Sequence, residues 1–437
     1  MARSVNVGAV VLLLAGCVGA DAPTDDASGH ESVAADVVVS WNERILEVAE
    51  AEDGFLTLKG VRAAAMLHLA AHDALAATGD QFHPFAFEAD VPEVDPVAAT
   101  NEAAYAVALA QYPDQQAVFD EERRRWLADR GTPSDEAASL GQQAADAILR
   151  LRRDDEWNTD PAYQWHPMGP GVYAEFNEHS GTPEGFVFGA GWAAARPFML
   201  ESAGQMRSPP PPEIESAAYT SAFREVKELG HRSSATRTID QSHLAMWWKE
   251  FVEKSHNRLA RELVSAEGLD LREANRLFAL LNMGIYDGYV ASFEGKFFYN
   301  HWRPYTAIRW AANDGNPDTH EDPDWTNLHD HTYAFPSYPS AHGTVCAAAM
   351  TMLVDVFGDD FPFEMTIPAV EAAGPMSPLV PMDPPTRSFD GFAQAAEECA
   401  LSRVYLGIHF RYDSEAGTQL GREIAEYGLG RFLKRTG

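Results

Sequence analysis

Basic residues are scarce in this chain, and lysine is the scarcest of them. The 437 residues hold 33 lysines and arginines, only six of them lysines, against 65 aspartates and glutamates. The formal net charge is -32 at pH 7, so we expect no nucleic-acid partner, because a phosphate backbone demands a basic surface. An acidic, solvated surface is the simplest account of this excess. Against that background, any cluster of cations indicates a specific anion site.

Cysteine is rarer still, with three residues in the chain. Residues 5–15 are mostly apolar, and residues 14–17, ending at Cys17, resemble the lipobox of bacterial lipoproteins. This apolar stretch is too short to span a bilayer. We predict a signal peptide over 1–17, lipidated at Cys17, followed by an acidic tether over 18–36. The protein would be exported to the bacterial cell envelope and touch the membrane only through its lipid anchor. A plain secretory signal is the alternative.

The other two cysteines, Cys346 and Cys399, leave two possibilities open. An exported protein is allowed a disulfide. Both residues also lie in apolar helical segments, where buried free thiols are equally expected.

Strand patterns are missing as well, since no stretch alternates convincingly with a period of two. Apolar positions instead recur at helical spacing over residues 41–76, 97–111, 134–152, 238–265, 271–299, 341–357, 388–407 and 413–434. With 46% hydrophobic residues a sizeable core is expected. We predict an all-α fold of helical bundles over 37–437, with N-terminal helices over 37–235 and a catalytic part over 236–437.

Three long segments are expected to be irregular. Residues 155–215 are rich in glycine, proline and aromatics, while residues 311–339 and 359–387 are polar or proline-containing and border core helices. Long loops in a compact domain are often functional.

The first candidate binding segment contains Lys296 and Arg303 at the end of a long helix. Seven positions are two helical turns, so both cations could reach one side. Arginine offers a planar fork of donors suited to oxyanions, and lysine a compact charge. Taken alone, such a pair would simply be a solvated helix face.

The second segment is Pro339-Ser340-Ala341-His342, at the start of an apolar helix. A serine N-cap leaves backbone N–H groups and the helix dipole facing any nearby anion. His342 beside them would titrate near neutral pH. The alternative is an ordinary serine cap beside a surface histidine.

The third segment adds a second guanidinium at Arg403 and the pair His409 and Asp413. Four residues apart on a helix, the carboxylate could hold one imidazole nitrogen and aim the other. Each segment alone is weak, but the three together specify an oxyanion pocket.

The ordered patterns Lys-x6-Arg-Pro, Pro-Ser-Ala-His and Ser-Arg-x5-His-x3-Asp resemble the superfamily of type 2 phosphatidic acid phosphatases and vanadium-dependent haloperoxidases. Over roughly 235–430 the chain is most similar to the secreted bacterial haloperoxidase-like branch. The resemblance implies a vanadate cofactor and assigns the following roles. Lys296, Arg303 and Arg403 would neutralise the equatorial oxygens, Ser340 and a backbone N–H at Ala341 or His342 would complete the cage, His409 would ligate the metal, Asp413 would orient His409, and His342 would be the acid–base group.

Two activities and one binding role follow from this resemblance. As a haloperoxidase, the protein would oxidise a halide with hydrogen peroxide and halogenate a small organic substrate, with Phe335 in the halide environment. As an acid phosphatase, it would hydrolyse a phosphate ester through a phosphohistidine at His409. A protein that only binds phosphate or vanadate is the third hypothesis.

Two further points remain open in the sequence. The family usually has glycine at the position of Ala341, and alanine there would cost about 1 kcal/mol if the backbone needs a positive φ. The acidic, histidine-rich segment 320–331 could bind a divalent cation, although its irregular spacing favours a solvated loop. An oligomer is compatible with such bundles.

Overall fold

The computed structural model describes residues 27–53, 58–128, 133–174, 186–329, 331–369 and 380–436. The expected signal peptide over 1–17, with Cys17, lies outside the described residues. The first helix begins at Ala27, inside the segment 18–36 that we expected to be a tether. Among the described residues, no helix is long and apolar enough to cross a membrane.

The prediction of an all-α fold is confirmed, since α-helices dominate the described residues and the strands form a single small sheet. The helices are α1 (Ala27–Asp53), α2 (Leu58–Ala77), α3 (Pro96–Gln111), α4 (Gln116–Leu127), α5 (Asp135–Leu151), α6 (Ala217–Leu229), α7 (Ile239–Trp247), α8 (Val252–Glu267), α9 (Leu271–Tyr299), α10 (Pro304–Arg309), α11 (Ala341–Phe357), α13 (Phe392–Tyr405) and α14 (Arg411–Leu429). Short 3-10 turns lie at η1 (Pro113–Gln115), η2 (Ala190–Ala194) and η3 (Ala311–Asn313).

Several helix starts follow directly from local capping. The Ser134 hydroxyl accepts from the backbone N–H of Ala137 to open α5, and Asp270 accepts from Glu273 N–H to open α9. Thr238 opens α7 with a full capping box. These caps explain why the expected starts of α5, α7 and α9 fall within a residue or two of the observed ones.

Other expectations need correction. The predicted helix over 41–76 is two helices, α1 and α2, and that over 238–265 is broken between α7 and α8. Helices α4, α6 and α10 lie in segments where we predicted none. Strand β1 (Phe363–Thr366) lies in the predicted loop 359–387, and its antiparallel partner β2 (Thr386–Phe389) runs from that loop into the predicted helix 388–407, which begins only at Phe392. Helix α10 has 6 residues and each strand has 4, so these elements carry too few apolar positions to establish a period.

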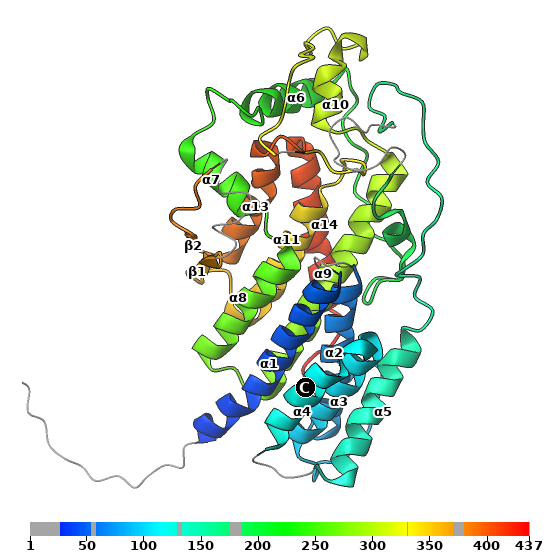
Figure 1. The fold of residues 1–437 in the computed structure, drawn as a ribbon, viewed down its shortest axis with the longest axis vertical. Coiled ribbons are helices and arrows are strands. Elements are labelled where there is room, and N and C mark those ends of the chain that lie inside the picture. Colours follow the sequence, from blue (N-terminus) through cyan, green and yellow to red (C-terminus); the bar gives the residue numbers. More distant parts are fainter. Residues whose placement is uncertain are drawn as a thin grey trace, which may run out of the picture.

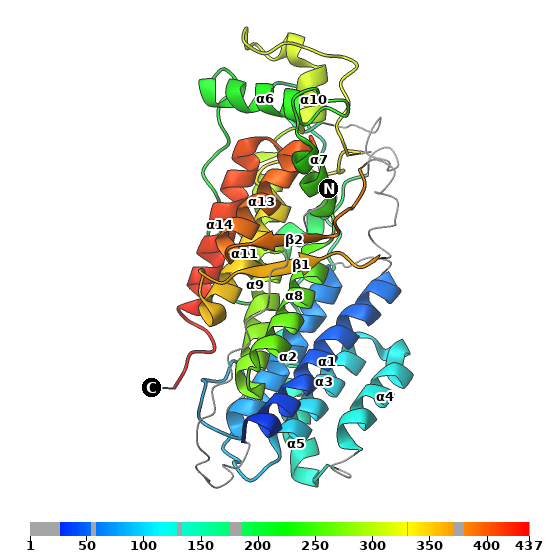
Figure 2. The same ribbon diagram turned by 90° about the vertical axis from the view of Figure 1, so that its left-hand side faces the viewer.

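Helix α9 is the central element of the molecule. It packs against α1, α2, α8, α11 and α14, and in Figure 1 it runs from the end that holds α1–α5 toward the end that holds α6 and α10. Figure 2, turned by 90°, shows the β1–β2 hairpin lying across one side of the bundle. Most of α9 is buried on all sides, as expected for a helix inside a large core. Its last turn carries Lys296 into the site described below.

The irregular segment after residue 186 is tied to α9 by one carboxylate. Buried Asp287 accepts hydrogen bonds from the backbone N–H groups of Phe198, Met199 and Leu200, at 2.6, 2.8 and 3.1 Å. An unpaired buried N–H is costly, so this carboxylate gives a segment without regular structure a defined position.

The two cysteines that the sequence left open form a disulfide. Cys346 of α11 and Cys399 of α13 are joined across 53 positions of sequence. The bond ties together two of the helices that carry candidate site residues.

Replacing both cysteines, as Cys346→Ala with Cys399→Ala, should lower the free energy of unfolding by up to about 4 kcal/mol. Without the disulfide, the unfolded chain is no longer cross-linked across 53 positions, so its conformational entropy rises and unfolding becomes more favourable. Urea unfolding of variant and parent, with and without reductant, measures the effect. Reductant should destabilise the parent and leave the double variant unchanged, and the denatured parent should gain two titratable thiols on reduction. Equal stability of parent and variant would contradict this prediction.

Candidate active site

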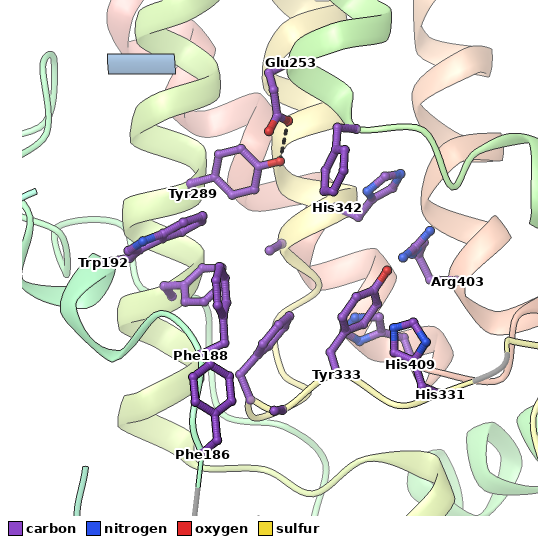
Figure 3. A pocket seen from close by; sticks show the side chains of 15 residues that line it. Phe186, Phe188, Trp192, Glu253, Tyr289, His331, Tyr333, His342, Arg403 and His409 are labelled. Carbon is purple, nitrogen blue, oxygen red and sulfur yellow. Dashed lines mark hydrogen bonds between the residues drawn. The ribbon is translucent and has the colours of Figure 1, made fainter. Parts of the chain in front are cut away.

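A cavity of about 500 Å³ opens between α9, α11, α13 and the loop that leads into α11. Figure 3 shows it from close by: His342, Arg403 and His409 lie on one side, and Trp192, Phe188 and Phe186 on the opposite side. The polar side draws on the second and third sequence segments identified above, through Ala341, His342, Arg403 and His409.

His409 and Asp413 are in direct contact. His409 Nδ1 lies 2.9 Å from Asp413 Oδ2, and both side chains are buried. Since a carboxylate accepts, Nδ1 carries the proton and Nε2 is left without one. We expected both residues on one helix, but α14 begins at Arg411, so His409 lies just before it and Asp413 in its first turn. The contact is as expected, although the local geometry is different.

Asp413 also accepts from the hydroxyl of Ser337 and, at 3.1 Å, from the backbone N–H of Phe410. Burial raises the pKa of Asp413, and the Ser337 hydrogen bond and the charge of Lys296 oppose that rise. Burial, then the positive charges of Arg303 and Lys296, hold the pKa of His409 well below its usual range. The imidazole is therefore neutral at physiological pH.

Arg303 is in contact with the imidazole of His409. Its Nη1 donates to the carbonyl of Ile408 at 2.9 Å and lies 3.1 Å from His409 Nε2, while Nε donates to the carbonyl of Phe335 at 2.9 Å. Its Nη2 is buried without a hydrogen-bond partner. Burial lowers its pKa to about 10, so the guanidinium stays charged at neutral pH.

The seven-residue spacing suggested that Lys296 and Arg303 share one helix, but Arg303 lies outside the helix of Lys296. Helix α9 ends at Tyr299, Asn300 takes a left-handed φ of 49°, and Arg303 is the N-cap of α10. The chain leaves the helical path at that point, and the Arg303 guanidinium reaches the loop before α11, where it donates to the Phe335 carbonyl.

Lys296 is fully buried, and its ammonium donates to the carbonyls of Pro336, Ser337 and Pro339 at 3.1, 2.7 and 2.6 Å. Burial and the nearby charge of Arg303 lower its pKa well below the usual value. These three hydrogen bonds hold the loop that carries Ser337 and leads to Ser340. Lys296 therefore does not line the cavity in this structure.

Ser340 caps α11, and its hydroxyl accepts from Gly343 N–H at 3.2 Å. Its own N–H donates to the carbonyl of Asp413 at 2.9 Å, which joins the α11 start to the α14 start. Helix α14 comes so close that a β-carbon at Gly417 would clash with the Ser340 carbonyl oxygen. Ala341 is the first helical residue of α11, so the concern about a positive φ does not apply.

The remaining polar residues are His342 of α11 and Arg403 of α13. His342 Nε2 and Arg403 Nε are both buried without a hydrogen-bond partner. Burial, and then the charge of Arg403, lower the pKa of His342 well below its usual range. Arg403 Nη1 makes a long contact of 3.4 Å with the carbonyl of Trp248.

Three cations thus share one buried region with a single close carboxylate, Asp413. Like charges held together away from water are costly unless an anion joins them. The unpartnered nitrogens on Arg303, Arg403 and His342 are the groups that an anion would satisfy.

The cavity also contains residues that the sequence did not single out. Ser337 supports Asp413, and Glu253, Tyr289, Phe188 and Trp192 line the walls. Only Ser337 stood next to a recognised motif, and the others come from segments with no signal of their own. Phe335 lines the cavity as expected, with its ring centroid 4.7 Å from the guanidinium carbon of Arg303.

The segment 320–331 forms no metal-ligand cluster among its described residues. In the part of the chain that the structure describes, the one such group is His342 with Cys346 and Cys399, and those sulfurs are already bonded to each other.

Fold and site together define a class: an all-α bundle protein with a buried group of cationic side chains near the start of a helix. A family model described as the second helical-bundle domain of VCPO matches residues 276–435, the part that contains every candidate anion-site residue. Over these residues the chain resembles the vanadium haloperoxidases.

Individual relatives agree with this assignment. Vanadium chloroperoxidase of Curvularia inaequalis is 28% identical over 259 residues, covering 47% of this chain and 42% of the relative, so the match spans less than half of that protein. The crystal structure of the first bacterial vanadium-dependent iodoperoxidase has a TM-score of 0.73 at 23% identity, covering 92% of this chain and 97% of that one. Holo-type bacterial vanadium-dependent chloroperoxidase has a TM-score of 0.62 at 17% identity, covering 93% and 94%.

Asp413→Ala should release the fixed tautomer of His409, since the acceptor of its Nδ1 proton is lost. Nitrogen-15 NMR of the ring nitrogens measures this directly. In the parent protein, His409 should stay neutral and Nδ1-protonated from pH 8 down to at least 6.5, because its pKa is lowered. The control is Glu225→Ala, which removes the partner of Arg411 on the same helix. A charged or Nε2-protonated His409 in the parent at pH 7 would contradict the assignment.

Proposed function

We propose that this protein is a vanadium-dependent haloperoxidase, which oxidises a halide with hydrogen peroxide at a vanadate held in this cavity. The observation that carries the proposal is the unprotonated His409 Nε2 beside two buried arginines that each keep an unpartnered nitrogen. A neutral imidazole nitrogen is a metal ligand, and free guanidinium donors suit an oxyanion.

The residues present fit vanadate. His409 would ligate the metal, Arg303 and Arg403 would neutralise its oxygens, and Ser340 with the N–H of Ala341 would complete the shell. Bound there, vanadate would act as a Lewis acid that activates hydrogen peroxide toward a halide. Lys296 would act mainly by holding the loop that carries Ser340 in place.

The other residues have roles that the geometry supports. Asp413, held by Ser337, keeps the proton on His409 Nδ1, so that Nε2 remains available. His342, with Nε2 unpartnered and its pKa lowered, would accept and return protons at the cavity wall. Phe335 lies against Arg303 and would shield the halide from water. The relatives include both chloroperoxidases and an iodoperoxidase, so our proposal names the halide only as a class.

Export with a lipid anchor at Cys17 remains part of the proposal. The Cys346–Cys399 disulfide supports it, because disulfides persist in oxidising compartments outside the cytosol.

The full chain, with its lipid anchor held in detergent, should bind orthovanadate and then oxidise iodide, bromide or chloride with peroxide. His409→Ala should abolish halide oxidation, and Arg403→Ala should weaken vanadate binding about 10- to 100-fold. Calorimetry measures binding, and formation of triiodide or a brominated dye measures activity. The matched control is His320→Ala, an exposed histidine outside the cavity, which should behave as the parent does. Removing vanadate with excess phosphate and restoring it should switch the activity off and on.

A parallel assay without vanadium follows hydrolysis of a phosphate ester. Hydrolysis that vanadate inhibits and that His409→Ala abolishes, with no halide oxidation, would replace our proposal with the phosphatase hypothesis. Vanadate binding with neither activity would instead leave an oxyanion-binding protein.

A further inference from the structure

One histidine and two cysteines gather where α11 packs on α13. His342 and Cys346 lie four residues apart on α11, so their side chains share one face of that helix, and Cys399 meets them from α13. One ring nitrogen of His342 and the two sulfurs all lie within 4.8 Å of one another. Among the described residues, this is the one group of three potential metal ligands that lie so close together.

Their spacing suits a tetrahedral zinc ion. Bonds of about 2.3 Å to sulfur and about 2.0 Å to nitrogen place the ligand atoms of such a site roughly 3.5–3.8 Å apart. The Cα atoms of Cys346 and Cys399 are 6.7 Å apart, so two free sulfurs can reach that separation by rotation about their own Cα–Cβ bonds. Zinc binds thiolates, so only the reduced protein offers all three ligands.

The imidazole of His342 is oriented as a ligand would be. Its Nε2 is buried without a hydrogen-bond partner, and the ring makes a hydrogen bond with the backbone of Trp248. Since Nε2 has no partner, this hydrogen bond belongs to Nδ1, which donates to the carbonyl oxygen. Histidine ligands of metals usually donate their other N–H to a carbonyl or carboxylate in this way, and the free nitrogen then faces the metal.

The local charge favours a site made of thiolates. Arg403 follows Cys399 by one turn of α13, and its charge acts on His342. A neighbouring guanidinium stabilises a thiolate against the thiol. Zinc held by two thiolates adds no net charge to this buried region, whereas zinc held by neutral ligands would place a second uncompensated cation beside Arg403.

An ion can reach this group from the cavity. His342 lines the cavity, while Cys346 and Cys399 are fully buried next to it. Figure 3 shows His342 and Arg403 on the same side of the open space. A water molecule in the cavity can supply the fourth ligand, as in zinc sites with three protein ligands.

We propose that the reduced protein binds one Zn²⁺ through His342, Cys346 and Cys399, and that formation of the disulfide releases the ion. The chain is synthesised with both thiols reduced, so the dithiol state precedes the disulfide in every molecule. Bound zinc occupies the ring nitrogen that the proposed function uses for proton transfer. The zinc-bound protein is therefore an inactive form, a consequence that rests on the proposed function.

Each step balances in atoms and electrons. A dithiol reductant converts the disulfide to two thiols and is itself oxidised to a cyclic disulfide. Zinc then displaces one proton from each thiol, so two protons are released per ion. In the reverse direction, hydrogen peroxide takes two electrons from the two thiolates, its O–O bond breaks, and with two protons it gives two water molecules, the disulfide and free Zn²⁺.

Binding is tested on the full chain in detergent, free of vanadate, after reduction with a phosphine that is then removed without air. The probe is Co²⁺, because a tetrahedral cobalt site with thiolate ligands gives a sulfur-to-metal charge-transfer band and strong visible bands. We expect one equivalent of Co²⁺ to produce these bands in the reduced parent, and one equivalent of Zn²⁺ to remove them. The oxidised parent should show no bands.

His342→Ala keeps both thiols and should weaken zinc binding at least about 10- to 100-fold, measured by competition with a chromophoric chelator. The double variant Cys346→Ala with Cys399→Ala should give no cobalt bands. The matched control is His320→Ala, an exposed histidine outside the cavity, which should bind as the parent does. Equal zinc affinity of the parent and His342→Ala would overturn the proposal, as would bands in the double variant or no bands in the reduced parent.

Peroxide added to the zinc-bound parent should release one equivalent of zinc to an indicator as two thiols are lost, and zinc retained after that loss would also overturn the proposal. Iodide oxidation by the oxidised, vanadate-loaded parent reports separately on the proposed function, because the cobalt bands do not depend on it. If that activity is present, the zinc-bound protein should oxidise iodide only after a lag that ends with zinc release. An immediate full rate would contradict the inactive form.

Discussion

The site depends on placing three cations, Lys296, Arg303 and Arg403, in a buried region with one close carboxylate. Such an arrangement is costly in a low-dielectric interior unless each charge is compensated. Lys296 is compensated by three loop carbonyls, and Arg303 by two carbonyls and the imidazole of His409. Arg303 Nη2 and Arg403 Nε remain buried without a hydrogen-bond partner, and these two nitrogens are the basis for proposing an anion site.

The surrounding fold supplies the rigidity that this arrangement needs. Helix α9 delivers Lys296 from the centre of the core, and the disulfide joins α11, with His342, to α13, with Arg403. The Ser340 N–H and the Asp413 carbonyl join the starts of α11 and α14. Because these contacts link three helices around one cavity, the distance between His342 and Arg403 is set by helix packing.

The two halves of the cavity divide the proposed chemistry. The cationic half, with His409 and Asp413, suits vanadate, peroxide and halide, which are small and polar. The aromatic half, with Phe188 and Trp192, excludes the water that would weaken electrostatic interactions nearby. Glu253 lines the cavity and accepts from the Tyr289 hydroxyl.

The sequence by itself determined the all-α class and the approximate extent of most long helices. The 3.6-residue apolar period and capping residues such as Thr238 and Asp270 are local signals. It also singled out the candidate site residues, because Lys296, Arg303, Ser340, Arg403 and His409 stand in ordered motifs.

Only the tertiary structure decided how those residues meet. The end of α9 at Tyr299 and the left-handed Asn300, not helical spacing, bring Arg303 to His409, and the packing of α11 on α13 pairs the two cysteines. It also decided that Lys296 holds a loop and does not line the cavity, and it brought Trp192 and Glu253 to one wall from segments without any motif. Contacts between distant segments depend on how whole surfaces pack, and no local pattern of residues records that.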